Sequence, residues 1–281
     1  MHHLLTVFAL ACGLSIAGSV RICAFNIRSF GDSKISNETI STVIVDIIKR
    51  YDIALIQEVR DENLSAVKLL MDKLNSATPN TYLYEVSDPL GRSTYKERYL
   101  FIYRKAVVSV TSSYHYDDGS EEMGTDIFSR EPFVVEFSSP HSAVQDFAII
   151  PQHTSPTEAV KEIDALYDVV LDVKKRLGIE DMLIIGDLNA GCSYVKQSDW
   201  AQIRLRGDGQ FQWLIPDSAD TTVGHTECAY DRIIASGSAM KSAVIVETAV
   251  IYNFQEAFNL SDEMAQAVSD HYPVEVSLRA A

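Results

Sequence analysis

The chain has 281 residues, of which 47% are hydrophobic and 22% are charged, and its formal net charge is −15. This is a globular composition, and the length accommodates either one large α/β domain or two small ones. The negative charge excludes a protein that wraps nucleic acid with a broad basic face, and by itself it points to bound calcium or magnesium.

Residues 1–19 differ from the rest of the chain. They contain no Asp, Glu, Lys or Arg, they are mostly apolar, and they end in Ala17, Gly18 and Ser19, a small-residue pattern suited to signal peptidase. A membrane anchor is the alternative, but the apolar run is short for a span. We therefore expect a signal peptide over 1–19, a secreted protein that begins near Val20, and no membrane partner.

The first part of the mature chain alternates strands with helices. A strand-like run over 20–25 is followed by apolar residues at helical spacing from Ile40 to Ile48, for which Ser36 is the expected N-cap. A strand is expected over 53–56 and a second helix near 63–74.

From residue 99 the pattern changes to successive strands. They are expected over 99–103, 107–116, 133–137 and 147–150, with no helix between them, and a helix over 156–177, a strand over 182–185, strands over 231–235, 243–251 and 274–278 and a helix near 261–268 follow. Because βα alternation and strand meanders both occur, two packed sheets or one mixed sheet fit better than a Rossmann fold. No linker interrupts the pattern, so we expect a single domain over 20–281.

Three cysteines remain in the mature chain. Cys23 lies in a strand-like run and is expected to be a buried thiol, whereas Cys192 and Cys228 both lie in turn-rich segments. A secreted protein favours one disulfide among three cysteines, so we expect Cys192 to pair with Cys228.

Glycosylation sequons begin at Asn37, Asn63 and Asn259. Asn37 is the best candidate because it lies at an expected helix start.

Short polar motifs follow several of the apolar strands. They contain Asn26, Glu58, Asp187 with Asn189, and Asp270. A polar residue that ends a buried strand costs stability unless it is satisfied, and strand ends are where α/β proteins build sites. Each motif alone has a plain alternative, such as a surface ion pair or an Asx turn. Together their carboxylate and amide oxygens form the ligand set of Mg²⁺.

Two histidines also follow strands. His153 comes after the run 147–150, and His271 follows Asp270. Phosphodiester hydrolysis needs a base to deprotonate water and an acid to protonate the leaving alkoxide. A lone histidine is more often structural, but two beside several carboxylates favour a metal-assisted, acid/base phosphodiesterase site.

This series of motifs resembles that of the endonuclease/exonuclease/phosphatase superfamily, in order and over essentially the whole mature chain. Two segments, 51–61 and 212–222, narrow the resemblance to its secreted deoxyribonucleases. The motifs that carry it are Asn26, 57–60, 95–99, His153, 186–189, 230–232 and 269–273. The resemblance implies a four-layer α/β sandwich, in which two packed mixed β-sheets are flanked by helices. It also implies a monomeric endonuclease that hydrolyses double-stranded DNA to 5′-phosphate products.

The resemblance assigns the catalytic residues. His271, oriented by Asp231, would be the base that activates water, and His153, oriented by Glu97, would be the acid. Glu58 would hold catalytic Mg²⁺ or Mn²⁺. The residues that help to bind metal and phosphate would be Asn26, Asp187, Asn189 and Asp270.

DNA contacts in the family are made through the minor groove. Arg60 and Tyr95 match the groove-inserting positions, and Arg92, Arg130, Thr226 and Tyr230 match backbone-contacting ones. A small contact area that recognises DNA by its shape neutralises few phosphates and so needs few cationic groups. A DNA substrate is therefore compatible with the acidic chain.

The family also binds structural Ca²⁺ at two loops. A solvated acidic loop is the alternative at each, but without cations its carboxylates would repel one another. The first loop is matched by Asp118, Asp126, Phe128 through its carbonyl, and Glu131. The second is matched by Asp220, Thr222 and Thr226, and the Cys192–Cys228 bond closes it.

The chain departs from the family pattern in several places. Ser120 and Met123 stand in the loop where the family has a second disulfide, so that loop should depend more on calcium. Gln152 replaces an apolar neighbour of His153. The other departures are Leu188 for an aromatic residue, Gly224 for a threonine, and Phe133 for a small residue at an actin contact.

Two other functions compete with a DNA endonuclease. One is a phosphodiesterase of the same superfamily that acts on sphingomyelin or inositol phosphates, against which Arg60 and Tyr95 argue. The other is a non-catalytic actin-sequestering protein. Tyr84 and Val86 match part of an actin-binding strand, but Phe133 argues against strong actin binding.

Overall fold

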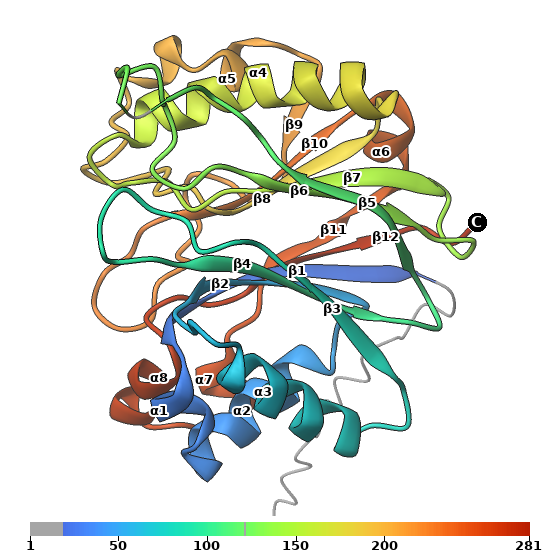
Figure 1. Ribbon diagram of the computed structural model, residues 1–281, viewed down its shortest axis with the longest axis vertical. Coiled ribbons are helices and arrows are strands. Elements are labelled where there is room, and N and C mark those ends of the chain that lie inside the picture. The colour runs from blue at the N-terminus through green and yellow to red at the C-terminus, as the bar shows by residue number, and fades with distance from the viewer. Residues whose placement is uncertain (1–18, 121) are drawn as a thin grey trace, which may run out of the picture.

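The computed structural model describes residues 19–120 and 122–281, so the expected signal peptide, apart from Ser19, lies outside the described residues. The described strands form two six-stranded sheets that pack face to face, and helices cover the outer faces (Figure 1). These four layers confirm the predicted α/β sandwich of two mixed sheets.

The first sheet is built on the N-terminal strand. β1 (Val20–Phe30) lies between β2 (Ile53–Val59), which runs parallel to it, and β12 (Val274–Leu278), which runs antiparallel. The order is β11-β12-β1-β2-β4-β3. The outer strands are β4 (Arg98–Arg104), β3 (Tyr82–Val86) and β11 (Val244–Ile251).

The second sheet has the order β5-β6-β7-β8-β10-β9. β7 (Asp146–Pro151) and β8 (Met182–Asp187) form its parallel pair, and β10 (Asp231–Ser236) is antiparallel to β8. The remaining strands are β5 (Ser109–His115), β6 (Phe133–Ser138) and β9 (Phe211–Trp213).

The helices divide between the two outer faces (Figure 1). Within the described part of the chain, none of them is both long and apolar enough to span a membrane. The first sheet is covered by α1 (Asp32–Ile35), α2 (Glu38–Ile48), α3 (Ser65–Ser76), α7 (Phe254–Ala257) and α8 (Asp262–Val268). The second is covered by α4 (Ala159–Leu177), the 3₁₀ turn η1 (Trp200–Gln202) and α5 (Arg204–Gly207), while α6 (Ser238–Ala243) leads into β11.

Strand β1 contributes to two apolar cores. Ile22 and Ala24 are buried between the sheets, whereas Cys23 and Phe25 are buried against the helices of the first sheet. This division follows from the two-residue period of a strand, which sends successive side chains to opposite faces. Cys23 is a buried free thiol, as predicted.

The helix cap predicted at Ser36 is wrong. Ser36 ends the short helix α1, and the next residue, Asn37, caps α2 by accepting hydrogen bonds from the backbone N–H groups of Thr39 (3.1 Å) and Ile40 (3.2 Å). Serine and asparagine are equally good caps, and a four-residue helix leaves no periodic signal that would separate them.

Candidate active site

The polar residues predicted at strand ends meet where the two sheets face each other. Asn26 of β1 lies opposite Gln57 of β2 in the first sheet, and Asp187 of β8 lies opposite Asp231 of β10 in the second. The Asn26 side-chain amide donates to Asp187 Oδ2 across the sheets at 3.1 Å. All four residues are buried, so the sheet packing itself assembles a polar site.

The backbone of this site adopts unusual conformations. Glu58 and Asn189 have positive φ angles of 57° and 46°, which side-chain-bearing residues seldom adopt. Gly186 has a φ of 133°, and a Cβ atom there would lie 2.3 Å from the Gln152 carbonyl oxygen, so glycine is required. Such conformations persist only where the surrounding structure enforces them, and they are concentrated at functional sites.

The first histidine is fixed on two sides. His153 follows β7, and its Nδ1 atom lies 2.8 Å from Glu97 Oε2. Its backbone N–H donates to the Tyr99 hydroxyl at 2.9 Å. Because Nδ1 faces a carboxylate, it carries a proton and Nε2 is the atom that faces the site.

The second histidine has the same arrangement. His271 precedes β12, and its Nδ1 atom lies 2.7 Å from Asp231 Oδ2. Ser269 positions this loop, because its hydroxyl donates to the Asn26 carbonyl at 2.6 Å. The structure therefore brings together both histidine–carboxylate pairs implied by the resemblance.

The two histidines converge on one atom. The Nε2 atoms of His153 and His271 each lie 3.6 Å from Asp187 Oδ2. Two Nε2 atoms on either side of one buried point can serve a single reacting group, one as proton acceptor and the other as proton donor.

Electrostatic interactions couple these groups. Burial lowers the pKa of His271, but the neighbouring carboxylates Asp231 and Asp187 outweigh burial and raise this pKa to about 10. Burial raises the pKa of Asp187, and the two histidines outweigh it, so that this pKa is lowered. The central carboxylate is therefore ionised at neutral pH.

The raised pKa of His271 predicts how the stability of the cation-free protein depends on pH. A raised pKa stabilises the folded state below the ordinary value of 6.5, and that contribution is lost as the pH rises toward about 10. In chelator, the free energy of unfolding of the wild-type protein should fall relative to that of His271→Ala between pH 7 and pH 10. Urea denaturation at three pH values measures this difference; parallel pH dependences for the two proteins would contradict the prediction.

Oxygen atoms around Asp187 could hold a cation. The Asn26 amide nitrogen donates to Glu58 Oε1 and to Asp187 Oδ2, both at 3.1 Å, which places the two carboxylates around one point. Asn26 Oδ1 and Asp270 Oδ1 are buried without a hydrogen-bond partner among the described residues. Unsatisfied buried oxygens beside carboxylates fit a hard divalent cation. Asn189 also lies here: its backbone N–H donates to Asp187 Oδ1 at 2.9 Å.

The residues predicted to contact DNA fall into two groups. Tyr95 is 41% exposed, and the Arg60 guanidinium lies 4.2 Å from the centre of its ring, so these two form a solvent-exposed cation–π pair. Arg130 is instead largely covered, and its Nε atom lies 3.1 Å from Glu97 Oε2, the same oxygen that His153 Nδ1 contacts. Arg92 hydrogen-bonds to Asp126 (3.1 and 3.2 Å).

The first predicted calcium loop brings its acidic residues together. Carboxylate oxygens of Asp118, Asp126 and Glu131 lie within 4.8 Å of one another. Burial and the neighbouring carboxylates raise the pKa of Glu131. The Phe128 carbonyl accepts from Arg92 at 3.4 Å. The three carboxylates could bind a cation, which would relieve their repulsion.

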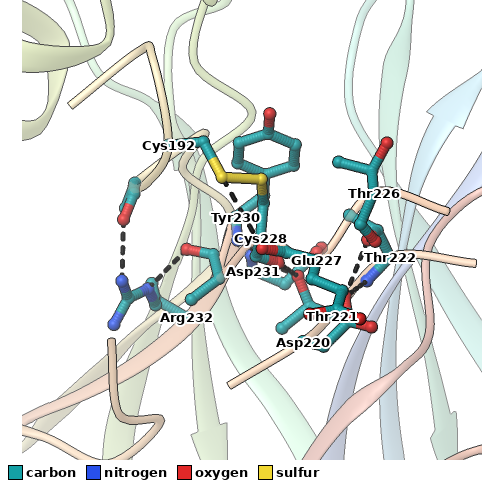
Figure 2. The surroundings of a disulfide bond; sticks show 12 residues. Cys192, Asp220, Thr221, Thr222, Thr226, Glu227, Cys228, Tyr230, Asp231 and Arg232 are labelled. Carbon is teal, nitrogen blue, oxygen red and sulfur yellow. Dashed lines mark hydrogen bonds between the residues drawn. A yellow bond between two sulfur atoms is a disulfide. The ribbon is translucent and has the colours of Figure 1, made fainter. Parts of the chain in front are cut away.

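The second predicted loop lies beside His271 and is closed by a disulfide (Figure 2). Cys192 and Cys228 are bonded, as predicted from the sequence. The Thr222 hydroxyl donates to the Thr226 carbonyl, and the Asp220 carboxylate accepts from the Thr222 backbone N–H at 3.0 Å. This arrangement places the three predicted oxygen donors of the loop together (Figure 2).

Sequence reasoning missed the positioning role of Arg232. It is 1% exposed, and it donates to the carbonyls of Ala190 (2.7 Å), Ile215 (2.9 Å) and Ala229 (2.9 Å). Arg232, which is labelled beside Asp231 in Figure 2, thereby ties together the segments that contain Ala190, Ile215 and Ala229. A charged residue inside an expected buried strand was the available signal.

The side chain of Gln152 does not point at the His153 ring. Its amide donates to Glu162 Oε2 at 3.0 Å, on the far side of the loop. The amide of Gln152 therefore finds its partner on helix α4, in the helix layer of the second sheet.

Comparison with known proteins identifies the class to which this fold and site belong. Residues 23–271 match the endonuclease/exonuclease/phosphatase family, and the chain belongs to this family. Solved structures agree on the fold: the human Nocturnin catalytic domain aligns with a TM-score of 0.62 at 14% identity, over 94% of this chain and 95% of that one.

Closer relatives narrow the class. The chain is 58% identical to rat deoxyribonuclease-1 over 266 residues, which are 95% of this chain and 94% of the relative. It is 56% identical to the human deoxyribonuclease-1 over 273 residues, which are 97% of each. The chain is therefore an enzyme similar to deoxyribonuclease I.

Proposed function

We propose that this protein is a secreted, monomeric endonuclease that hydrolyses double-stranded DNA with a divalent cation and leaves 5′-phosphate ends. One observation carries the proposal: two histidines, each oriented by a carboxylate, present Nε2 at 3.6 Å from the same Asp187 oxygen. The identity to deoxyribonuclease-1 over nearly the whole chain supports DNA as the substrate. The disulfide between Cys192 and Cys228 supports an oxidising compartment.

The two histidines divide the proton transfers. His271 Nε2 accepts a proton from the attacking water, and Asp231 stabilises the imidazolium that forms. A cation bound beside Asp187 and Asp270 would offset these two carboxylates, which raise the pKa of His271 in the cation-free site, and would thereby leave the imidazole unprotonated and able to act as a base. His153 Nε2 donates a proton to the leaving 3′ oxygen, and Glu97 holds its ring in place. Because both act at one point beside Asp187, the phosphate lies between them.

The oxygens of Glu58 and Asn26, with those of Asp187, Asn189 and Asp270, would hold Mg²⁺ or Mn²⁺. When bound there, the cation would neutralise charge on the phosphate, which the acidic site alone cannot do. Asn26 Oδ1 and Asp270 Oδ1, which are unpartnered among the described residues, are the observation that supports this ligand set.

DNA would be held by a few contacts. The exposed pair of Arg60 and Tyr95 would enter the minor groove, and Tyr230 lies beside His271 with ring centres 6.2 Å apart. Thr226 and Arg92 lie at the two calcium loops, where they would contact the phosphate backbone. We place Arg130 with Glu97 rather than on the DNA.

Nicking of supercoiled plasmid by the secreted protein tests the proposal. Mg²⁺ should convert the plasmid to open circles, and added Ca²⁺ should increase the rate. Sphingomyelin and inositol phosphates should remain intact under the same conditions. Cleavage of either of these with an unaltered plasmid would replace the proposed substrate with a small or lipid phosphodiester.

Calcium chelation should destabilise this protein measurably. The loop that holds Asp118, Asp126 and Glu131 contains no disulfide among the described residues, because Ser120 and Met123 stand where the family has its second disulfide. Chelator should lower the Tm by several degrees, consistent with the loss of about 1–3 kcal/mol of binding free energy. Thermal denaturation measures the shift. The variant Asp118→Asn should show a smaller shift, and a Tm that is insensitive to chelator would exclude calcium as a structural ion.

A further inference from the structure

We propose that Glu162, a buried carboxylate of helix α4, is a positioning residue that holds both members of the His153–Glu97 pair in register. This inference rests on the proposed function of His153 as general acid. Glu162 is fully buried, yet it belongs to the apolar stripe of α4 with Ala159 and Ile163. A charged residue on such a stripe is costly unless hydrogen bonds satisfy it.

Glu162 accepts hydrogen bonds from three N–H groups on two separate segments. Its Oε2 accepts from the Gln152 amide at 3.0 Å and from the Ser155 backbone at 3.2 Å. Its Oε1 accepts from the Ser129 backbone at 3.2 Å. These bonds offset the burial of the charge, and they tie helix α4 to both segments.

The first segment carries the acid. Gln152 and Ser155 flank His153 on either side, so Glu162 holds the loop at two points. The Gln152 carbonyl is also held, because it accepts from the Gln57 amide at 2.8 Å. Both polar groups of the Gln152–His153 peptide are therefore hydrogen-bonded, the carbonyl to Gln57 and the N–H to Tyr99.

The second segment carries the partner of Glu97. Ser129 precedes Arg130, whose Nε lies 3.1 Å from Glu97 Oε2. The Tyr99 hydroxyl links the two segments directly, because it accepts a hydrogen bond from the His153 N–H at 2.9 Å and donates one to the Arg130 carbonyl at 3.4 Å. Glu162 thus belongs to a closed series of contacts that includes Arg130 and His153, the two residues that contact the Glu97 carboxylate.

The hydrogen-bond donors around Glu162 support this geometry. Burial raises the pKa of Glu162 and outweighs the bonds from Ser129 and Ser155 and the Arg130 guanidinium, which lower it. Each carboxylate oxygen nevertheless faces a backbone N–H group, of Ser129 or of Ser155. No glutamine rotamer reproduces the arrangement, because one of its two ends presents N–H₂ to a backbone N–H donor. Glu162→Gln therefore keeps the shape of the side chain but loses the hydrogen bond to the backbone N–H of either Ser129 or Ser155.

The experiment compares kinetics at saturating Mg²⁺ and Ca²⁺. Glu162→Gln should lower kcat for plasmid nicking by roughly tenfold with KM changed by less than about twofold, since misplacement of a catalytic group by a fraction of an ångström costs this much. A nucleotide diester with a p-nitrophenolate leaving group needs no proton from the acid, so its hydrolysis should fall much less.

A double-mutant cycle identifies the route of the effect. In a His153→Ala background, Glu162→Gln should cause no further loss, because a positioning residue has nothing left to position. If the kcat losses of the two single variants multiply in the double variant, Glu162 acts independently of His153 and the inference is overturned.

Two controls separate positioning from folding. Val169→Ala removes a buried side chain from the same helix and should lower Tm without changing kcat per folded molecule. Proton NMR gives a readout that does not depend on activity: the Nδ1 proton of His153, bonded to Glu97, should broaden in Glu162→Gln and stay sharp in Val169→Ala. Absence of nicking by the wild-type protein would refute the proposed function instead, whereas an unchanged His153 signal and kcat in Glu162→Gln would refute only the positioning role.

Discussion

Replacing His271 by alanine is expected to lower kcat for DNA hydrolysis by about 10²–10⁴-fold, the usual contribution of a general base. The reason is geometric. His271 Nε2 is directed at the site by the 2.7 Å contact between Nδ1 and Asp231, and no other described imidazole except His153 lies within 4.0 Å of Asp187. Plasmid nicking at saturating DNA measures the effect.

The control for this variant is another histidine. His141 is exposed in the turn between β6 and β7, so His141→Ala should keep the wild-type rate. Asp231→Asn should approach the loss seen for His271→Ala, because an amide can favour the wrong imidazole tautomer. A His271→Ala protein that nicks within threefold of the wild-type rate would exclude His271 as the base.

Glu58→Gln is expected to have the second large effect, a loss of roughly 10²-fold in rate at millimolar Mg²⁺ through weaker cation binding and charge stabilisation. Glu58 is held by two bonds, from the Asn26 amide at 3.1 Å and from the Ser29 backbone N–H at 2.9 Å. Glutamine has nearly the same shape but no charge, so the substitution tests the charge alone.

A magnesium titration distinguishes this explanation from a folding defect. The concentration of Mg²⁺ for half-maximal rate should rise in Glu58→Gln, while Tm in chelator should change little. Glu62, four residues along the chain and exposed, provides the matched control Glu62→Gln, which should titrate like the wild type. An unaltered magnesium requirement in Glu58→Gln would place the cation elsewhere.

The sequence predicts the layers of this fold well because strands and helices differ in hydrophobic period. The long buried strands and α4 were visible as continuous or periodic apolar runs. The short elements were not. β9 has three residues and α1 has four, which is too few for a period to appear. Their boundaries depend on contacts with the sheets, which no local pattern contains.

The residues that act in the site and the carboxylates that orient its histidines could be predicted, but the buried charged residues that support them could not. Asn26 and Glu58 stand out because each is polar at the end of an apolar run, and His271 stands out because it belongs to a polar motif just before a strand. The ion pair of Arg130 with Glu97 was missed because an exposed arginine and one paired with a buried carboxylate look alike in sequence. Glu162 was missed for the opposite reason: a single charge among apolar residues of a helix is easily read as solvent-facing.

One side chain has a wider consequence for how the protein tolerates change. Gln57 donates to the Gln152 carbonyl at 2.8 Å and accepts from the Asp187 N–H at 2.9 Å, so it joins a strand of one sheet to two strands of the other. These two hydrogen bonds thereby fix the spacing of the two sheets next to the active site. A larger or smaller residue in the apolar layer between the sheets would change the distance that Gln57 spans, so we expect such a substitution to alter turnover as well as stability. The apolar layer between the sheets therefore contributes to the geometry of the active site. We expect the side-chain volumes that it accepts without loss of activity to span a narrower range than those it accepts without loss of stability.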